Sequence, residues 1–372
     1  MSKNKKIFWC SKCLSMSTRP RISYDKDKVC NACKWTEKKK KINWKKRKIE
    51  LESLLSKYRK KNGQFDCLVP VSGGKDGSYV IYNLQRKYNM NPLAVTINPP
   101  LRLELGKKNL ENFSKSGFTL TSLDLDYNTM RELNKIGFKK LGMPYWGWNT
   151  AITTAPIRMA ISKNIKLIFY GEDGEVEYGG SKETENQAIF SVNYQKEVYM
   201  EGAYKSIINK KFKNKKTSYF FSYPENNKIL SDIKLTHWSY FENWDPYRNY
   251  LIAKKYCGLQ ENDENNLGTF TNFAQNDQAL YSLHAYLMYL KFGFGRANQD
   301  ACIEIRRGAM DRQQAINLVN LYDGQYPEQF IKIYLEYFKM SKKNFDLTID
   351  KFANKKLFNK IKGRWKPTFK IK

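Results

Sequence analysis

The pattern of apolar and polar positions predicts alternating strands and helices in the middle of the chain. Short apolar runs predict buried strands, and longer segments with apolar residues at helical spacing predict the helices between them. The predicted strands are 67–71, 93–97, 119–125 and 165–170, and the predicted helices are 78–88, 103–116, 129–140 and 151–163. This alternation favours an α/β fold, an open parallel sheet with helices on both faces. Ligands of such folds bind at the carboxyl ends of the strands.

The pattern changes on either side of this region. Residues 36–61 are rich in lysine with apolar residues at helical spacing, which predicts a basic linking helix or, alternatively, an arm for nucleic acid. Polar, aromatic-rich segments follow the sheet region, and helical spacing returns at 275–291, 313–322 and 328–338. The predicted domains are a four-cysteine unit (1–35), the basic helix (36–61), the sheet domain (62–177), and an aromatic-rich insertion followed by a helical substrate-binding region (178–372).

Composition narrows the class of protein. The 372 residues contain no apolar run of about 18 residues, and the lysine-rich N-terminus lacks the apolar core of a secretory signal, so neither a membrane span nor secretion is expected. The seven cysteines fit metal binding in a reducing compartment better than a disulfide framework, so a cytoplasmic protein is expected. The net charge of +30 comes mostly from lysine, as in a chain from an AT-biased genome. Anionic small substrates, an acidic partner or nucleic acid are the alternative explanations.

Two C-x-x-C pairs near the N-terminus predict a metal site. Cys10 and Cys13 form one pair and Cys30 and Cys33 the other, at the spacing of four-cysteine zinc sites. An iron site fits two such closely spaced cysteine pairs less well than a zinc site does. Four thiolates leave no position for water, so the predicted zinc is structural.

The stretch from Val69 to Ser78 predicts a phosphate site. A buried strand, two glycines and a helix N-terminus place backbone N–H groups around an anion, and Gly73 and Gly74 allow the backbone to approach it closely. Ser72 and Ser78 add hydroxyl donors and Lys75 adds a positive charge. The stretch is neither a Walker A loop nor a dinucleotide fingerprint.

A second strand end carries carboxylates. Gly171, Glu172, Asp173, Gly174 and Glu175 follow the predicted strand 165–170, and three carboxylates in so short a turn suit Mg²⁺ on a triphosphate or the polarisation of a nucleophile. A polar exposed turn is the alternative. In a parallel sheet this segment, the Ser72 loop and residues 96–98 converge at one edge.

Candidates for substrate binding lie further along the chain. His237 and Trp238 begin a stretch dense in aromatic and hydrogen-bonding groups, which suits a sugar ring and an ordinary core edge equally well. Arg296, Arg306 and Arg312 can hold a carboxylate or diphosphate, or can belong to a solvated face.

The order Ser-Gly-Gly-x-Asp-x-Ser at 72–78 resembles the pyrophosphate loop (PP-loop) of the N-type ATP pyrophosphatases, whose fold is of the adenine-nucleotide alpha-hydrolase type. Gly77 separates Asp76 from Ser78, whereas the general loop often places serine directly after aspartate. Taken together, the motifs resemble the N-acetyl sugar amidotransferases of bacterial surface-glycan synthesis, which serve pseudaminic and legionaminic acid pathways and lipopolysaccharide O-antigen assembly. The matching segments are 9–33 with Arg19-Pro20-Arg21-Ile22, 71–78, 171–175, 291–312 and 322–324.

This resemblance implies conversion of a sugar acetamido group to an acetamidino group. ATP would adenylate the acetamido oxygen, and ammonia would then displace AMP. The implied cofactors are ATP, Mg²⁺ and Zn²⁺. The implied ATP-binding residues are Ser72, Gly73, Gly74, Lys75, Asp76, Gly77, Ser78, Thr96 and Gly171, and the implied catalytic residues are Asp76, Glu172, Asp173 and Glu175.

The source of ammonia is expected to be a separate subunit. Residue 2 is serine, so processing cannot expose a cysteine nucleophile there, and the scattered cysteines have only two histidines as partners. The resemblance suggests a glutaminase similar to that of imidazole-glycerol-phosphate synthase.

Two other functions are compatible with parts of the sequence. A PP-loop tRNA thiolase would share the loop, the zinc unit and the charge, but normally needs reactive cysteines near the loop, and Cys67, Cys257 and Cys302 show no paired spacing. A non-catalytic zinc-ribbon RNA-binding protein would explain the charge but neither the loop nor the acidic segment. Nucleic acid is therefore not the expected partner.

Overall fold

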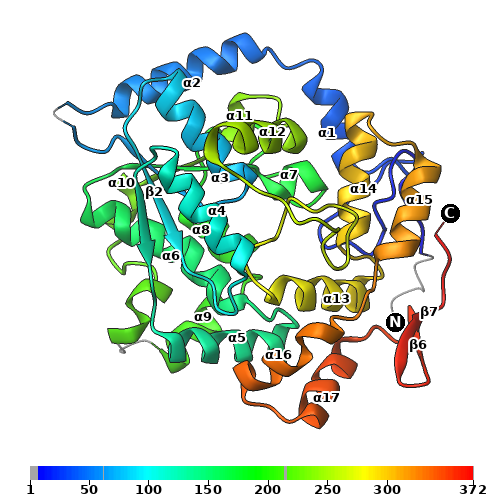
Figure 1. The fold of residues 1–372 in the computed structure, drawn as a ribbon. Helices are drawn as coiled ribbons and strands as arrows, with labels where there is room; N and C mark the ends of the chain where they lie inside the picture. The colour runs from blue at the N-terminus through cyan, green and yellow to red at the C-terminus, as the bar shows by residue number, and fades with distance from the viewer. Residues whose placement is uncertain (1–6, 62, 213–215, 372) are drawn as a thin grey trace.

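The computed structural model describes residues 7–61, 63–212 and 216–371, and its centre is a five-stranded parallel sheet (Figure 1). The strands are β1 (Cys67–Pro70), β2 (Pro92–Ile97), β3 (Leu120–Leu123), β4 (Leu167–Tyr170) and β5 (Lys234–His237). Their order is β3-β2-β1-β4-β5, so the chain runs outward in opposite directions from the neighbours β1 and β4. This arrangement opens a crevice at the carboxyl ends of β1 and β4, where sheets of this kind bind ligands.

Side chains of alternate strand residues fill two cores, one on each face of the sheet. Leu68 and Ile168 belong to one core, and Val69 and Phe169 belong to the other. This follows from the period of two in a strand that is covered on both faces. The first core is covered by α5 (Tyr127–Leu141) and α6 (Trp146–Ser162), and the second by α2 (Trp44–Tyr58), α3 (Lys75–Tyr82), α4 (Glu104–Lys115) and α12 (Pro246–Cys257).

The structure confirms the mixed α/β architecture with a parallel sheet. All four predicted strands and the helices between them are present, with shifted ends. The first of these helices begins at Lys75 rather than at 78, because Gly74 is its N-cap, and it continues as the π-helical η1 (Asn83–Lys87). The fifth strand, β5, was not predicted, since its four residues form no apolar run. Because β5 pairs with β4, the sheet extends beyond the predicted range 62–177.

The N-terminal unit leads into two helices where one was predicted. α1 (Asn31–Lys39) begins inside the second C-x-x-C pair, and α2 follows after a short break. Leu51 and Leu55 of α2 are buried against the sheet domain, whereas Ile49 is 66% exposed, so the apolar face of this helix is narrow. The four cysteines pack on α14 (Arg296–Arg307) and α15 (Arg312–Tyr322), which lie beside the N-terminal unit in Figure 1.

The remaining elements frame the sheet. Between β4 and α12 lie α7 (Gly174–Tyr178), α8 (Val192–Tyr194), η2 (Gln195–Tyr199), α9 (Tyr204–Lys211), η3 (Lys216–Phe221), α10 (Asn227–Asp232) and α11 (Trp238–Phe241). The C-terminal part contains α13 (Leu280–Phe292), η4 (Glu328–Phe330), α16 (Ile331–Phe338), α17 (Lys342–Phe352), β6 (Phe358–Ile361) and β7 (Arg364–Pro367), and it has a core of its own around Tyr334 and Phe338. Helices were predicted at α13, α15 and α16, but not at α14. Within the described ranges, no helix combines the length and the apolar character needed to cross a bilayer.

Candidate active site

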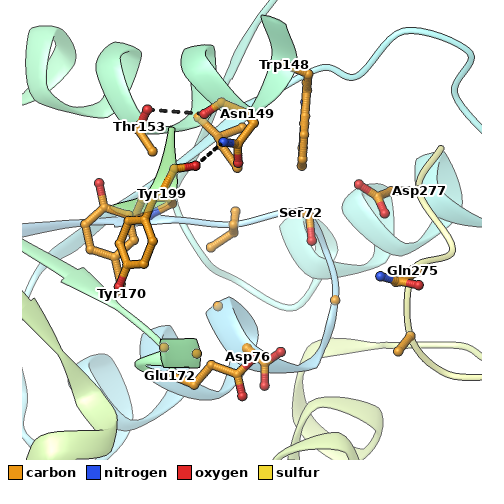
Figure 2. Close-up of a pocket in the computed structure, with 18 of the residues that line it drawn as sticks. Ser72, Asp76, Trp148, Asn149, Thr153, Tyr170, Glu172, Tyr199, Gln275 and Asp277 are labelled. Carbon is orange, nitrogen blue, oxygen red and sulfur yellow. Dashed lines mark hydrogen bonds between the residues drawn. The ribbon is translucent and has the colours of Figure 1, made fainter. Parts of the chain in front are cut away.

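A cavity of about 630 Å³ occupies the crevice at the carboxyl ends of the strands (Figure 2). Its lining comes from distant parts of the chain: Ser72 follows β1, Gly171 follows β4, Trp148 lies on α6, and Gln275 precedes α13. Figure 2 shows the side chains of these segments surrounding one open space. A cavity of this size can hold a nucleotide together with part of a second substrate.

The loop after β1 is shaped for an anion. Gly73 has φ +79°, and a Cβ atom there would lie 2.9 Å from the backbone nitrogen of Leu110, so only glycine fits. Gly74 caps α3 without any side-chain hydrogen bond to the first turn. The N–H groups at the start of α3 are therefore free of a protein cap at the cavity wall, and the helix dipole adds positive potential there.

Two carboxylates and one ammonium group lie at this helix start. The Lys75 Nζ to Asp76 Oδ2 distance is 2.5 Å. Burial favours the neutral form of Lys75, but the carboxylates of Asp76 and Glu172 outweigh it and raise the pKa of Lys75. Burial, together with the nearby Asp76 carboxylate, raises the pKa of Glu172 to about 7. The three groups therefore form one electrostatically coupled cluster, and Figure 2 shows Asp76 and Glu172 side by side.

Glu172 is held in place by two donors. Trp244 Nε1 donates a hydrogen bond to Glu172 Oε2 at 3.0 Å, and the Tyr178 hydroxyl donates to the same oxygen. Asp76 Oδ1, in contrast, is buried without a hydrogen-bond partner. A carboxylate oxygen with no donor beside a second carboxylate suits a hard cation, so Asp76 and Glu172 fit Mg²⁺.

Gly171 allows α3 and the end of β4 to approach each other. A Cβ atom on Gly171 would lie 3.1 Å from Asp76 Cβ and 3.2 Å from Trp244 Cη2. A larger residue would have to displace one of these side chains. Gly171 therefore helps to set the separation of the two carboxylates.

The other two predicted acidic residues differ in position. Asp173 is 6% exposed, lies outside the cavity lining, and caps α7 by accepting from the N–H groups of Glu175 and Val176. Glu175 lines the cavity, where Arg21 donates two hydrogen bonds to its carboxylate. Burial favours the protonated form of Glu175, but Arg21 outweighs it and lowers the pKa.

His237 lines the cavity between two other polar groups. Tyr199 Oη and His237 Nε2 are 3.0 Å apart, and His237 Nδ1 lies 3.6 Å from Asp173 Oδ2. Phe190 stacks on the imidazole with ring centroids 4.2 Å apart. Burial lowers the pKa of His237 to about 3, so the imidazole is neutral at pH 7.

The cavity brings together only part of the predicted site. Ser72, Gly74, Lys75, Asp76, Gly77, Gly171, Glu172, Glu175, His237 and Arg296 line it. Gly73 belongs to the loop but not to the cavity lining, Ser78 and Thr96 are buried in α3 and β2, and Trp238 is buried in the core beside Phe169. Arg306 lies at the cysteine cluster, with Nη1 3.8 Å from Cys13 Sγ, and Arg312 begins α15. Strand and helix periodicity directs Ser78 and Thr96 away from the cavity, and the motif alone does not reveal that direction.

Several lining residues were not singled out from the sequence. They are Trp148, Asn149 and Thr153 on α6, Tyr170, Tyr199, Gln275, Asp277 and Tyr281. Asp277 is the most informative of them, because burial raises its pKa to about 7 and its Oδ2 has no hydrogen-bond partner. In the sequence, α6 differs from the other helices of the sheet domain in its several threonine and tryptophan residues.

The cysteine cluster has the geometry of a zinc site. The ligand atoms of Cys10, Cys13, Cys30 and Cys33 all lie within 4.8 Å of one another and are buried. Cys10 Sγ and Cys33 Sγ are 3.8 Å apart, and Cys13 Sγ and Cys30 Sγ are 3.7 Å apart. Tetrahedral zinc with Zn–S bonds of about 2.3 Å requires a sulfur–sulfur separation of about 3.8 Å. These four thiols can therefore hold zinc with little rearrangement.

Comparison with known proteins gives two matches. Residues 267–372 match a family described as the C-terminal domain of WbpG-like lipopolysaccharide (LPS) biosynthesis proteins. The match covers less than a third of the chain, and it shows that this C-terminal part is similar to that family. The matched region contributes Gln275, Asp277, Tyr281 and Arg296 to the cavity lining.

The second match is to a single protein. An uncharacterized protein of Methanocaldococcus jannaschii, MJ1599, is 31% identical over 125 residues, which is 33% of this chain and 45% of that protein. The chain therefore covers less than half of that relative.

Proposed function

We propose that this protein is an ATP-dependent, AMP-forming amidotransferase of surface-glycan synthesis. It would convert the acetamido group of a sugar to an acetamidino group. The observation that carries the proposal is the cluster of Lys75, Asp76 and Glu172 at a helix start without a side-chain cap, inside a cavity walled in part by the WbpG-like region.

The chemistry requires activation because an amide oxygen is a very poor leaving group. The acetamido oxygen attacks the α-phosphorus of ATP, and the bond to the β-phosphate breaks to release pyrophosphate. Ammonia then adds to the amide carbon, the C–O bond breaks, and AMP leaves with the former acetamido oxygen. The free N–H groups at the start of α3 and the Lys75 ammonium would stabilise charge on the departing pyrophosphate.

The lining suggests where each substrate lies. Adenosine would contact Val95 and Ile97, which flank the predicted Thr96, while the sugar would lie toward Tyr199, His237 and Arg296. Asp76 and Glu172 would hold Mg²⁺, which neutralises phosphate charge when bound. Ammonia would come from a separate glutaminase subunit, and the reaction would take place in the cytoplasm.

The cavity chemistry fits a tRNA thiolase less well. All seven cysteines are buried, and none of them lines the cavity. A persulfide or cluster mechanism needs a thiol that reaches the activated substrate. A non-catalytic RNA-binding protein would not explain the adjacent carboxylates of Asp76 and Glu172 in the cavity.

Isotope transfer tests the proposal directly. An acetamido sugar labelled with ¹⁸O in its acetyl carbonyl is incubated with ATP and ammonium, and the products are analysed by mass spectrometry. We expect pyrophosphate, an acetamidino sugar and AMP that carries the label. Formation of ADP and phosphate, or unlabelled AMP beside an acetamidino product, would contradict the mechanism.

A substitution in the loop tests the role of Asp76, and a second substitution serves as its control. Asp76→Asn should lower AMP formation at least tenfold with the fold intact, because one electrostatic contact to a transition state is typically worth a few kcal/mol. Asp311→Asn on the exposed start of α15 serves as the comparison, and it should leave the rate unchanged.

A further inference from the structure

A second cavity, of about 510 Å³, adjoins the active-site cavity. The two share Arg21, Tyr145, Glu175 and Glu201 in their linings, so the Arg21–Glu175 ion pair forms part of the wall between them. The rest of its lining comes mainly from the N-terminal unit and from the region around α13, with Leu141, Met143 and Gln299 in addition. The N-terminal unit contributes Arg19 and Pro20, and the region around α13 contributes His284, Met288, Lys291 and Phe294.

Two cations in this second cavity lack a carboxylate partner. The Arg19 guanidinium lies over the Phe294 ring, 5.7 Å from its centroid, and forms no ion pair with the described residues. Lys291 Nζ donates to the backbone oxygen of Leu141 at 3.2 Å and likewise forms no ion pair with the described part of the chain. Burial lowers the pKa of both groups and outweighs the opposite effect of Glu175 on Arg19 and of Glu201 on Lys291. Both of these carboxylates are ion-paired with Arg21. An anionic group between them would remove this cost.

Neutral groups complete the lining. His284 Nδ1 is buried without a hydrogen-bond partner, and its ring lies 4.6 Å from that of Tyr145, centroid to centroid. The imidazole can exchange a hydrogen bond with a hydroxyl or an anion. Tyr145, Phe292 and Phe294 offer flat apolar surfaces of the kind on which sugar or base rings pack.

We infer that this second cavity binds the anionic end of the acetamido substrate, a carboxylate or a phosphate, through Arg19 and Lys291. The substrate would extend past Arg21 and Glu175, so that its acetamido group enters the active-site cavity. The identity of the substrate as an acetamido sugar rests on the proposed function, whereas the anion site rests on the two unpaired cations. Neutral acetamido sugars would therefore bind poorly.

Equilibrium binding to the full, zinc-loaded chain tests this inference. The probes are N-acetylglucosamine, its 1-phosphate, N-acetylglucosaminuronic acid and the methyl ester of that acid, each added with a non-hydrolysable ATP analogue. The free acid and its ester differ in one charge, so this pair reports on a carboxylate, while the 1-phosphate reports on a phosphate. We expect at least one anionic probe to bind about tenfold or more tightly than its neutral counterpart.

Variants on two separate elements localise the effect. Arg19→Met and Lys291→Met should each lower the affinity for the preferred anionic probe about tenfold, leave the ATP analogue and neutral probes unchanged, and keep a cooperative thermal transition. Arg19→Lys should restore part of the preference. Lys255→Met, on the exposed side of α12, removes one charge outside both cavities and should have no effect.

Equal affinity for charged and neutral probes, no binding of any probe, or an equal loss for both kinds in Arg19→Met would overturn the inference. Failure of the proposed chemistry would appear differently. The binding preference would remain, but no labelled AMP would form.

Discussion

Arg21 and Glu175, 154 residues apart, form a two-fold hydrogen-bonded ion pair between the N-terminal unit and the acidic strand end. The Nε–Oε2 distance is 2.8 Å and the Nη2–Oε1 distance is 2.7 Å. Two parallel hydrogen bonds fix the orientation of both side chains, which a lysine could not do. The pair therefore ties the N-terminal unit to the wall of the cavity at the strand ends.

A double-mutant cycle measures this connection. Arg21→Met and Glu175→Gln should show a coupling free energy of unfolding of about 1 kcal/mol, small because the arginine side chain is 35% exposed. The folded-state pKa of Glu175 is lowered, so this contribution is present above its ordinary pKa of 4.5 and is lost as the pH falls through the lower folded value. Denaturant unfolding from pH 7 down to acid checks both points. A coupling that persists at low pH would contradict this assignment.

Glu172 should give the opposite pH dependence. Its folded pKa of about 7 exceeds the ordinary 4.5, so the folded protein retains a proton that the unfolded chain loses, and stability falls as the pH rises from 4.5 to 7. Glu172→Gln should remove this penalty and raise the unfolding free energy at pH 8, by about 1.4 kcal/mol for each pKa unit of the shift. The same variant should abolish AMP formation. Denaturant unfolding at pH 5 and pH 8 provides the comparison, and a uniform destabilisation at both would refute the pKa assignment.

Metal content tests the cysteine cluster. We expect one zinc per chain by elemental analysis, and Cys30→Ser should lose it and unfold more readily, because zinc binding contributes folding free energy in so small a unit. Cys302→Ser is the matched control, since Cys302 is buried in the same cluster of side chains but is not one of the four ligands. That variant should keep its zinc. No zinc in the wild type, or two equivalents, would be incompatible with the site.

The ammonia source predicts a distinct pH profile. The purified chain should use ammonium salts but not glutamine, and its rate should rise as the pH is raised from neutral towards the pKa of ammonium, because only free ammonia is nucleophilic. Adding the glutaminase should restore glutamine use and flatten this rise. Turnover of glutamine by the chain alone would show that no separate subunit is needed.

Local patterns were sufficient for the parts of the site formed by continuous chain. The glycines at 73 and 74, between an apolar run and a helix, indicated the loop after β1, and the paired cysteines indicated the metal cluster. Both depend on neighbours within a few residues. The acidic strand end was located as well, but not the direction of its side chains, so Asp173 was grouped with Glu172 although it caps α7.

The far wall of the cavity could not be predicted in this way. Asp277 lies near the loop after β1 because its backbone packs closely on α4. A Cβ atom on Gly106 of α4 would lie 2.5 Å from Asp277 Cα. No periodicity in either segment encodes this contact. The position of Arg306 could not be predicted either. Its charge suggested a role in substrate binding, but α14 packs on the N-terminal unit and places the guanidinium beside the sulfur of Cys13.

The packing of the cysteine unit on α14 has a consequence for synthesis of the protein. Asn298 Nδ2 donates to the Leu14 backbone oxygen at 3.0 Å, and Ser15 Oγ donates to Cys302 Sγ at 3.6 Å, contacts that span 284 and 287 residues. On the ribosome, the cysteine unit emerges early but must wait for α14 before its buried face is covered. A nascent or truncated chain that lacks α14 therefore also lacks Arg296 in the lining of the cavity at the strand ends.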